Sequence, residues 1–544
     1  MSNIEIPFPE ERSRTYRFFE ILPGALAYLM LVLPVVLSLI NVTLAAVFVL
    51  VYLLVNFCRG LAGAVRGLHG YHVMRVHQKY PWPQMLSELE AGEVSGSRVK
   101  RPKWHLDELK RLGDRPLLMR PSEVIHAIIV PTVNEPEEIL RTTLETILAS
   151  DFDMKQVVLI LAYEGRAGKD TEQRVLKLVK EYKKHFMDAF ATKHPAGLPG
   201  EDIGKGGNIN FAGRTLKVYL EDRKIDPVRV MVTTLDADNR PDKNYLNALT
   251  YAYTAAPNPL RASYQPVVLY TNNIWDAPAP MRVIATGNSL FDLVISLRAH
   301  ALRNFSSHAQ PMAALIETDF WSARTVVEDG HQYWRSYLTF NGDYRVYPLH
   351  LPIGQDAVLL ESYRKTLKAQ FYQLRRWTYG ASDVSYVAYY GFFHKNKIPK
   401  WDLWTKFWRL LEGHVTWAVG PVLVLTSGFV PALFNPKNFA ANELPLIVSR
   451  VQTVGILALV ITVFMALRTL PPKPARYKHH RTVFMVLQWA YFPITTLCYN
   501  SLAAFNSQTR LMFRWYLRKF DFTEKAVVVE TEDEGTVTRV NDKV

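Results

Sequence analysis

Two apolar runs close to the N-terminus constrain the fold of this chain more than any other feature. Residues 21–40 and 42–57 contain no charged side chain. Each run approaches the ~20 residues that cross the hydrocarbon core of a bilayer, the second being somewhat shorter. No small-residue cleavage site separates the two runs, which favours a retained helical hairpin over a cleaved signal peptide. Further apolar segments lie at 414–434, 446–467 and 483–508. The sequence therefore predicts a multi-pass integral membrane protein.

Positive charge is concentrated beside the apolar runs. The formal net charge is +14, and basic residues cluster at 59–79 and 468–481. Because basic loops tend to stay on the cytoplasmic side, we expect both segments to face the cytoplasm. The same placement argues against a nucleic-acid partner. Cys58 and Cys498 lie in apolar segments and provide neither a metal-ligand spacing nor a disulfide framework.

The region between residues 60 and 400 is too polar to cross a membrane and alternates between strand and helix patterns. Three short apolar runs predict buried strands, at 125–130, 156–163 and 228–238. Helical periodicity follows the first run, and a long polar helix is expected at about 172–192. This alternation predicts an α/β domain with an open, parallel-rich sheet, in which ligands bind at the carboxyl ends of the strands.

Two aspartates end the third predicted strand. Asp236 and Asp238 are separated by one residue, so in extended backbone both carboxylates can reach one divalent cation. Mg²⁺ or Mn²⁺ held by one or two carboxylates completes its coordination with substrate phosphates and water. The sequence therefore predicts a metal site here, with an ordinary acidic turn as the alternative.

Glycines flank Lys205 in the segment 200–210. A glycine-rich turn lets backbone N–H groups approach a phosphate, and a lysine adds charge. The segment is not a Walker-type P-loop, because Gly206 occupies the position of the required Ser or Thr. A phosphate-contacting turn and a flexible loop are both compatible with this pattern.

A pair of acids, Glu328 and Asp329, follows the short apolar step at 325–327. A carboxylate in such a pair can act as general base for an acceptor hydroxyl, which must lose its proton as it attacks. Acids are also favoured in the first turn of any helix, so a helix N-terminus is the alternative.

Five short motifs occur in a fixed order along the chain: VPTVNEP at 130–136, KGGNIN at 205–210, DAD at 236–238, VED at 327–329 and QLRRW at 373–377. Flanked by apolar helices on both sides, this set resembles the membrane-embedded glycosyltransferases of family 2, the group that contains cellulose synthase and hyaluronan synthase. The resemblance covers residues 124–380. It implies a cytoplasmic nucleotide-sugar transferase domain of the A type, inserted between N- and C-terminal transmembrane helices.

The resemblance also implies a donor site. The residues that would bind the nucleotide sugar are Pro131, Thr132, Glu135, Glu164, Lys205, Asp236 and Glu328. Asp236 would share with Asp238 the cation on the diphosphate. Glu164 is the nearest equivalent of two aspartates that usually follow the second strand in the family, because the turn here reads LAYEG. Gly206 stands where alanine is common.

For catalysis, the resemblance implies that Asp329 is the base, in a TED-like motif with valine in place of threonine. Gln373, Arg376 and Trp377 match the QxxRW motif, which lies beside the acceptor and the pyrophosphate in processive synthases. Arginine suits a departing diphosphate because its planar fork can engage phosphate oxygens bidentately. Such a single displacement inverts the configuration at the anomeric carbon.

A further segment, KFDFTEK at 519–525, resembles the FxVTxK gating loop of the synthases. It would place Phe520, Thr523 and Lys525 over the nucleotide, with an ordinary basic tail as the alternative. If the tail is cytoplasmic, the apolar segment 483–508 has to return to its own side. We therefore interpret it as an interfacial or re-entrant pair of half-helices, or two short crossings, against a single crossing with the tail outside.

The expected organisation has four parts: an N-terminal tail and hairpin (1–60), a cytoplasmic glycosyltransferase domain (61–400), interfacial and transmembrane helices (401–509), and a cytoplasmic tail (510–544). The leading functional hypothesis is a hexosyltransferase that moves a sugar from a nucleotide sugar, a UDP-sugar by preference, to a growing polysaccharide that crosses the plasma (inner) membrane. Expected partners besides donor and glycan acceptor are membrane lipid and accessory export proteins. The alternatives are transfer to a polyprenyl phosphate or other lipid acceptor, and a non-catalytic scaffold or transporter.

Overall fold

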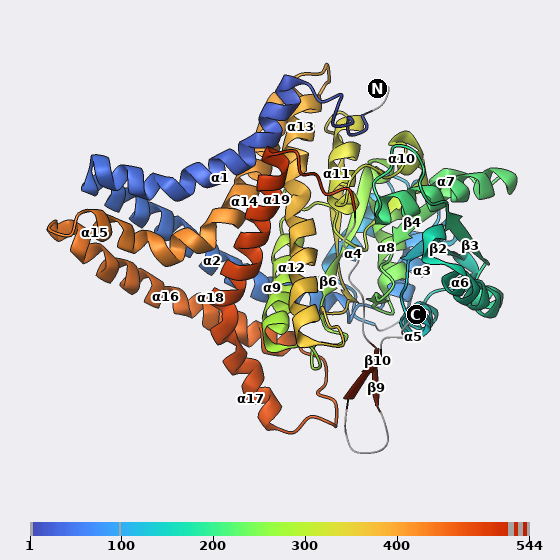
Figure 1. Cartoon of the computed structure of the whole chain (residues 1–544). Coiled ribbons are helices and arrows are strands. Elements are labelled where there is room, and N and C mark those ends of the chain that lie inside the picture. Colours follow the sequence, from blue (N-terminus) through green and yellow to red (C-terminus); the bar gives the residue numbers. More distant parts are fainter. Residues whose placement is uncertain (1–3, 97–98, 520–526, 531–536, 541–544) are drawn as a thin grey trace.

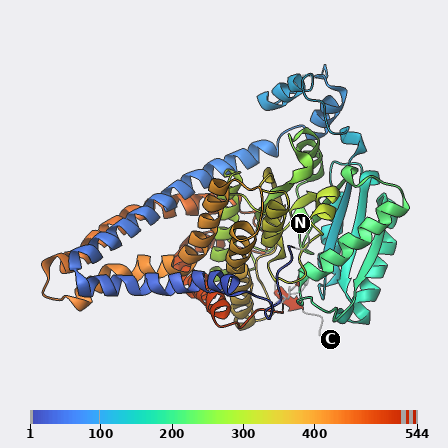
Figure 2. The ribbon, with the colours of Figure 1, turned by 90° about the horizontal axis from the view of Figure 1, so that it is seen from above.

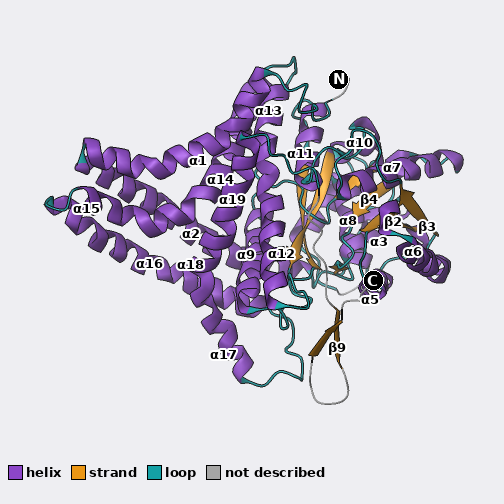
Figure 3. Ribbon diagram, viewed as in Figure 1, coloured by secondary structure: helices purple, strands orange, loops and turns teal. Residues whose placement is uncertain are grey.

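The computed structural model describes residues 4–96, 99–519, 527–530 and 537–540. An α/β domain occupies one end of the molecule, and long helices extend away from it at the other (Figures 1 and 3). The strands are β1 (Ile125–Thr132), β2 (Val157–Glu164), β3 (Asp188–His194), β4 (Val230–Thr234), β5 (Arg240–Pro241), β6 (Ala262–Leu269), β7 (Ala309–Pro311), β8 (Arg345–Gly354), β9 (Val527–Glu530) and β10 (Val537–Val540).

The helices of the α/β domain and of its border with the long helices are α3 (Trp82–Ala91), α4 (Lys103–Arg111), α5 (Glu137–Leu148), α6 (Lys169–Tyr182), α7 (Lys205–Asp222), α8 (Tyr245–Ala255), α9 (Ala279–Ser296), α10 (Met312–Glu317), α11 (Glu328–Thr339), α12 (Tyr363–Thr378) and α13 (Asp383–Phe392). The remaining helices are α1 (Arg14–Ile40), α2 (Val42–His77), α14 (Lys400–Thr426), α15 (Val430–Phe434), α16 (Phe439–Thr469), α17 (His480–Leu487), α18 (Phe492–Thr495) and α19 (Leu502–Met512).

The central sheet is mixed but parallel-rich. Its strand order is β3-β2-β1-β4-β7-β6-β8-β5. The strands β3, β2, β1 and β4 run parallel to their neighbours, and β6 runs parallel to β8. Only β7 and β5 pair in antiparallel fashion within this sheet. The α/β fold class expected from strand–helix alternation is therefore confirmed.

Helices cover both faces of the sheet, which explains why its inner strands are continuous apolar runs. On one face, Ile209, Ala212 and Leu216 of α7 pack against alternate residues of β1 and β2. On the other face, α5, α6 and α8 pack against the intervening residues. Side chains alternate across a strand, so β1 and β2 contribute to both hydrophobic cores.

Two details differ from the sequence-based expectation. The helix expected at 172–192 ends at Tyr182, and Asp188–His194 forms the edge strand β3. An edge strand buries only some of its residues, here Ala189, Thr192 and His194, so it lacks the continuous apolar run that marked the inner strands. The strand expected to extend to residue 238 also ends earlier, at Thr234, which places both aspartates in the turn that follows β4.

Among the described residues, five helical segments are long and apolar enough to cross a membrane: Arg14–Ile40, Val42–His77, Lys400–Phe434, Phe439–Thr469 and His480–Met512. The first two form a hairpin that diverges from its tip toward the sheet domain, with α16 running along α2 (Figure 2). Many of their apolar side chains are exposed, such as Leu39, Leu54 and Leu457. Exposed apolar surface of this extent is typical of helices that face lipid.

The fifth segment lies differently from the other four. It runs beside α12 across the direction of the long helices and is interrupted near its middle by irregular turns (Figure 1). Both of its ends contact the α/β side: Arg481 donates to the carbonyl of Trp275 over 2.7 Å, and the N–H of Leu517, just after α19, donates to Tyr379 Oη over 3.3 Å. By length and composition this segment is also a candidate span, so its interfacial or re-entrant course stays a prediction.

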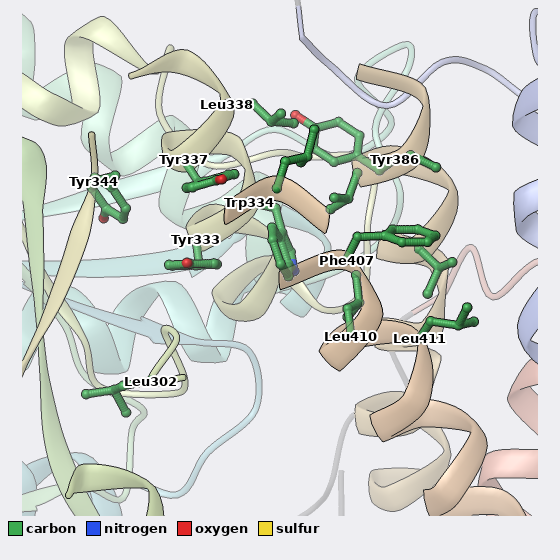
Figure 4. Packing of buried hydrophobic residues seen from close by; sticks show 14 of the residues in the cluster. Leu302, Tyr333, Trp334, Tyr337, Leu338, Tyr344, Tyr386, Phe407, Leu410 and Leu411 are labelled. Carbon is green, nitrogen blue, oxygen red and sulfur yellow. The ribbon is translucent and has the colours of Figure 1, made fainter. Parts of the chain in front are cut away.

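A hydrophobic cluster joins the α/β domain to the first turns of α14 (Figure 4). Trp334 and Tyr337 of α11 and Tyr386 of α13 belong to it together with Phe407 and Leu410 of α14. Because α11 begins with the predicted catalytic acids, the membrane helix α14 is packed directly against the element that carries them.

Candidate functional site

Three of the predicted acids surround the side chain of Lys205. The Lys205 Nζ atom lies 2.9 Å from Asp236 Oδ1, 3.1 Å from Asp329 Oδ2 and 3.8 Å from Glu328 Oε1. The four residues come from three elements, the start of α7, the turn after β4 and the start of α11, and the first and last of these are more than a hundred residues apart in the sequence. The structure therefore brings together Lys205, Asp236, Glu328 and Asp329, which we call the lysine–carboxylate cluster.

The close approach of α7 and α11 depends on Gly206. A Cβ at this position would lie 2.5 Å from the carbonyl oxygen of Ser322 and 3.3 Å from Glu328 Cβ. Any side chain would therefore push the first turn of α7 away from the segment that leads into α11. This contact gives a physical reason for glycine where the resembling family has alanine.

Burial and charge determine the protonation of the cluster. Burial lowers the pKa of Lys205, but the charges of Asp236, Asp329 and Glu328 outweigh it, so the net shift is upward and the ammonium stays charged. Burial, reinforced by the neighbouring Asp329 charge, raises the pKa of Glu328 to about 7, although Lys205 and Arg376 oppose the shift. At neutral pH the cluster thus contains one firmly charged lysine and one acid that is close to titrating.

The turn after β4 is held by side chains from other loops. Asp236 Oδ2 accepts hydrogen bonds from Ser306 Oγ at 2.5 Å and from Gln355 Nε2 at 2.9 Å. Asp238 is buried, and its Oδ2 accepts from the backbone N–H of Asp356 at 3.1 Å. No local sequence pattern marks Ser306 or Gln355, because each lies in a loop and contacts Asp236 only through its position in space.

The two aspartates fit a divalent cation in their chemistry, and they lie one residue apart in the turn after β4. After burial and Asp292, both of their charges contribute to the upward shift of the pKa of Tyr270. No group of three or more His, Cys, Asp or Glu that could hold a metal occurs in the part of the chain that the structure describes. An ion held by two carboxylates would take its other ligands from phosphate and water, as Mg²⁺ usually does.

His308 is a further neighbour of Asp329 that sequence reasoning missed. Its Nδ1 lies 3.5 Å from Asp329 Oδ1 and 2.9 Å from the carbonyl of Phe305, while Trp321 Nε1 donates to its Nε2 over 3.3 Å. Burial lowers the pKa of His308. The imidazole is therefore neutral with its proton assigned to Nδ1, from where it can support the carboxylate of Asp329.

The QLRRW segment lies on α12, next to the lysine–carboxylate cluster. The charge of Arg376 lowers the pKa of both Glu328 and Tyr270, although burial raises each of them overall, which places its guanidinium near the cluster. The ring of Trp377 lies 6.2 Å from the ring of Tyr270. Gln373 accepts from Gln370 at 3.0 Å, one turn earlier on the helix. The matching residues thus occupy one helix, α12, and among them the charge of Arg376 acts on Glu328 of the cluster.

The carboxyl ends of β1 and β2 hold the two acids expected at the nucleobase. Glu135 accepts hydrogen bonds from Thr132 Oγ1 at 2.6 Å and from the N–H of Val133 at 2.7 Å. Pro131 and Thr132 are the last two residues of β1. Glu164, at the end of the neighbouring strand, is also buried. Because β1 and β2 are parallel and in register, the two acids lie on the same edge of the sheet.

Glu164 belongs to a chain of charged groups that sequence reasoning did not find. His194 Nδ1 lies 3.3 Å from Glu164 Oε2, and its Nε2 lies 2.9 Å from Glu201 Oε2. Arg166 Nε lies 3.3 Å from Glu164 Oε2. Burial disfavours the charged imidazole, but the hydrogen bond to Glu164 and the charges of both glutamates outweigh it and raise the pKa of His194. His194 lies in β3, the strand that the sequence did not reveal.

Phe520, Thr523 and Lys525 lie outside the described residues. The residues immediately before them run beside the start of α7. The carbonyl of Arg518 accepts from the N–H of Ile203 at 3.0 Å, and Lys519 forms a parallel bridge with Ile203. The KFDFTEK segment therefore begins beside Ile203, two residues before Lys205 in the sequence.

No family model and no curated protein sequence matches this chain. Among solved structures, it is similar to the mannosyltransferase PcManGT from Pyrobaculum calidifontis in complex with GDP-Man and Mn²⁺, with 14% identity and a TM-score of 0.36 over 80% of this chain and 98% of that one. It is also similar to TarS 1–349 from S. aureus in complex with UDP-GlcNAc, with 11% identity and a TM-score of 0.36 over 77% of this chain and 100% of that one. GalNAc-T7 with UDP, GalNAc and Mn²⁺ matches over 53% of this chain and 57% of that one, with 12% identity and a TM-score of 0.31.

Proposed function

We propose that the protein is an inverting hexosyltransferase of the family 2 type, which moves a sugar from a nucleotide sugar, a UDP-sugar by preference, to a growing polysaccharide. The observation that carries this proposal is the lysine–carboxylate cluster at the carboxyl edge of the sheet, with Arg376 beside it. The cluster combines a base, Asp329, with a phosphate-binding cation, Lys205, and its Asp236 forms with the nearby Asp238 a pair suited to a metal. This combination is what a transfer from a nucleotide diphosphate requires.

Each step can be assigned to a residue. Asp329 takes the proton of the acceptor hydroxyl as its oxygen attacks the anomeric carbon, and the bond from that carbon to the diphosphate breaks. Arg376 stabilises the negative charge that develops on the departing diphosphate. Asp236 and Asp238 would hold Mg²⁺ or Mn²⁺, which neutralises phosphate charge when bound. Trp377 offers an aromatic face to an acceptor sugar.

Lys205 has a second role in this scheme. In the structure its single positive charge is shared between Asp236 and Asp329. A bound diphosphate competes for the same ammonium, and its arrival would free Asp329 to act as base. The nucleobase would lie between Glu135 and Glu164 at the neighbouring strand ends.

The proposed placement follows from the helices around the domain. The α/β domain lies in the cytoplasm, where sugar nucleotides are made, and the long helices span the plasma (inner) membrane, through which the glycan leaves. The boundaries proposed from the sequence remain 1–60, 61–400, 401–509 and 510–544. Accessory export proteins are proposed partners on the far side. Transfer to a polyprenyl phosphate or another lipid is the second candidate, favoured by the small number of candidate spans.

The direct test is a screen of radiolabelled UDP- and GDP-sugars with the purified full chain in Mg²⁺ or Mn²⁺, followed by sizing of the product. Asp329→Asn and Asp238→Asn should each lower turnover by roughly 10²–10⁴-fold, the range expected for loss of a catalytic acid or base. Asp343→Asn is a matched control, because Asp343 is 58% exposed and its partners Arg261 and Asn258 lie at the surface, away from the cluster. Turnover equal to wild type in both site variants would favour the scaffold alternative, and a single-sugar lipid product would favour the second candidate.

A further inference from the structure

The helices α2 and α14 contact each other through side chains at two successive positions along their length. A Cβ at Gly420 of α14 would lie 3.7 Å from Tyr52 Oη of α2. Two turns closer to the α/β domain, Arg59 of α2 forms an ion pair with Glu412 of α14. The two helices therefore run antiparallel. The next turn of each places Gly63 and Arg66 of α2 opposite Arg409 of α14.

The third wall of this space comes from the segment after α9. A Cβ at Gly67 would lie 3.4 Å from Val294 Cγ2, and one at Gly70 would lie 2.3 Å from the carbonyl of Leu293. The helices α9 and α2 therefore run antiparallel here, so the chain after Val294 continues along α2 toward Gly63. Arg298 comes one helical turn after Val294. His300 lies two residues beyond.

Arg66, Arg298, His300 and Arg409 thus converge around Gly63, and we call them the basic cleft. A Cβ at Gly63, Gly60 or Gly413 would meet no described atom within 4 Å, so no side chain fills the space directly over these glycines. Glycine at these positions leaves room for a ligand where other residues would fill the gap.

The basic cleft carries positive charge without matching acids. Burial, followed by the charges of Arg66, Arg409 and Arg59, lowers the pKa of Arg298. Burial and then the charges of Arg409, Arg298, Arg66 and Lys406 lower the pKa of His300. Arg59 and Lys406 have carboxylate partners in Glu412 and Asp402. In the described ranges, Arg66, Arg298 and Arg409 form no ion pair with a carboxylate. An anion in the cleft would relieve this repulsion.

The position of the basic cleft relative to the bilayer indicates the class of anion that can bind there. One face of α14 packs in the hydrophobic cluster through Phe407, Leu410 and Leu411 (Figure 4). The outer face exposes Trp401, Trp404 and Trp408, at 76%, 49% and 55% exposure. Exposed tryptophans on a membrane helix mark the headgroup level of the bilayer. Arg409 is adjacent to Trp408, and Arg59 directly follows the apolar part of α2. The cleft therefore lies at headgroup depth.

We propose that the basic cleft binds the phosphate of an anionic membrane lipid, with Arg66, Arg298 and Arg409 as its ligands. Arginine forks on three sides match a tetrahedral phosphate, and the lipid tails would lie against the apolar surfaces of α2 and α14. The segment after Arg298 continues to Ser306 and His308, which contact Asp236 and Asp329.

Native mass spectrometry of the full chain, released from detergent micelles, can count bound lipids directly. We expect wild type to retain phosphatidylglycerol at lower added concentration than phosphatidylcholine. Arg66→Gln with Arg298→Gln should weaken retention of phosphatidylglycerol about tenfold or more, since each basic group near a membrane adds appreciable attraction. Arg468→Gln is the matched control, because Arg468 lies at the same end of the long helices, over the Phe464 ring and outside the cleft.

Three outcomes would overturn the proposal: equal retention of both lipids by wild type, unchanged retention in the double variant, or an equal loss in the Arg468→Gln control. Competition by millimolar inorganic phosphate as effective as that by lipid would assign the cleft to a soluble anion instead. If the double variant does not fold, the single change Arg66→Gln answers the same question, because Arg66 is exposed on the helix surface. Arg66→Lys should restore part of the retention.

Discussion

At the scale of single residues, Lys205 is the centre of the candidate site. Its ammonium is largely buried, and three carboxylates lie around it. Their negative charge offsets the cost of removing the ammonium from water. Removing such a partner leaves a buried charge uncompensated, which is more costly than the pair is worth. The cluster is thus held in place by its own electrostatics before any substrate arrives.

Glu328 makes the stability of the cluster depend on pH. Burial raises its folded-state pKa from 4.5 to about 7. Because this pKa is higher in the folded than in the unfolded state, the protonated carboxyl contributes to the free energy of unfolding. That contribution is complete below pH 4.5 and is lost as pH rises through 7. The two limits differ by on the order of 3 kcal/mol. Glu328→Gln keeps a neutral side chain at every pH. We therefore expect the Tm of the variant, minus that of wild type, to become more positive between pH 5 and pH 8 in detergent solution.

Glu317→Gln provides the control for this measurement, since Glu317 is an exposed glutamate on the same domain. A Tm difference for Glu328→Gln that does not change with pH would show that the carboxyl does not titrate in this range.

At the scale of elements, the site is an arrangement of strand ends and helix starts. The first turns of α7 and α11 meet beside the turn after β4, and α12 lies next to them. Backbone N–H groups and dipoles at the starts of α7 and α11 favour negative charge, which suits both the acids and a bound phosphate. The contact between Gly206 and Ser322 sets the distance between the two helices.

Gly206→Ala should separate these helix starts. The added methyl group would meet the carbonyl of Ser322, which a buried backbone cannot easily avoid, at a cost of roughly 1–3 kcal/mol for overpacking. We expect a lower Tm and a clear loss of nucleotide binding, measured by thermal shift with UDP. Gly287→Ala is the matched control, because it adds the same methyl group in a helix where no described atom lies within 4 Å. Equal effects of the two substitutions would argue against a role for the α7–α11 contact.

The edge of the sheet at β2 and β3 has its own pH dependence. The pKa of His194 is raised by Glu164 and Glu201, despite burial, so its stabilising contribution is complete below pH 6.5 and is lost as pH rises through the higher folded-state value. His194→Gln should therefore lower the Tm most at pH 6, by a few degrees, and less at pH 9. His185→Gln, on the surface of the same region, is the comparison. A Tm deficit that grows with pH would contradict the assigned protonation.

At the scale of the whole molecule, the domain and the long helices form one unit. The N-terminal segment before α1 contacts the α/β domain. Glu5 forms an ion pair with the buried Arg335 of α11 at 2.8 Å and accepts a hydrogen bond from Ser322 Oγ. At the other end of the chain, Arg17 of α1 donates to the carbonyls of Leu511 and Met512. Both terminal segments therefore hold the membrane helices against the α/β domain.

The position of the C-terminal tail can be tested in oriented vesicles. Since Arg518 and Lys519 contact Ile203, we expect an epitope after residue 544 to be cleaved by protease from the same face as the α/β domain. Sealed vesicles of the opposite orientation are the control, in which the epitope should be protected. Cleavage only from the face opposite to the α/β domain would contradict both the interfacial course of His480–Met512 and the gating-loop hypothesis.

Local features whose pattern is continuous along the chain can be recognised from the sequence alone. Apolar runs without charge predicted the long helices, and apolar runs closed by turn residues predicted β1, β2 and the strand before Asp236, because burial on both faces leaves a mark on every residue. The ordered motifs indicated Lys205, Asp236, Glu328 and Asp329 as candidate residues. Their roles in catalysis remain a prediction.

Which groups meet depends on the three-dimensional fold. His308, Ser306, Gln355 and His194 lie in loops or in an edge strand, where no periodicity distinguishes them, and each matters through a partner that is distant in sequence. The same holds for the basic cleft, whose arginines come from three elements. Hydrophobic burial acts on runs of residues and can be recognised along the chain. Electrostatic and hydrogen-bonding partnerships act between single groups, and the fold alone places these groups together.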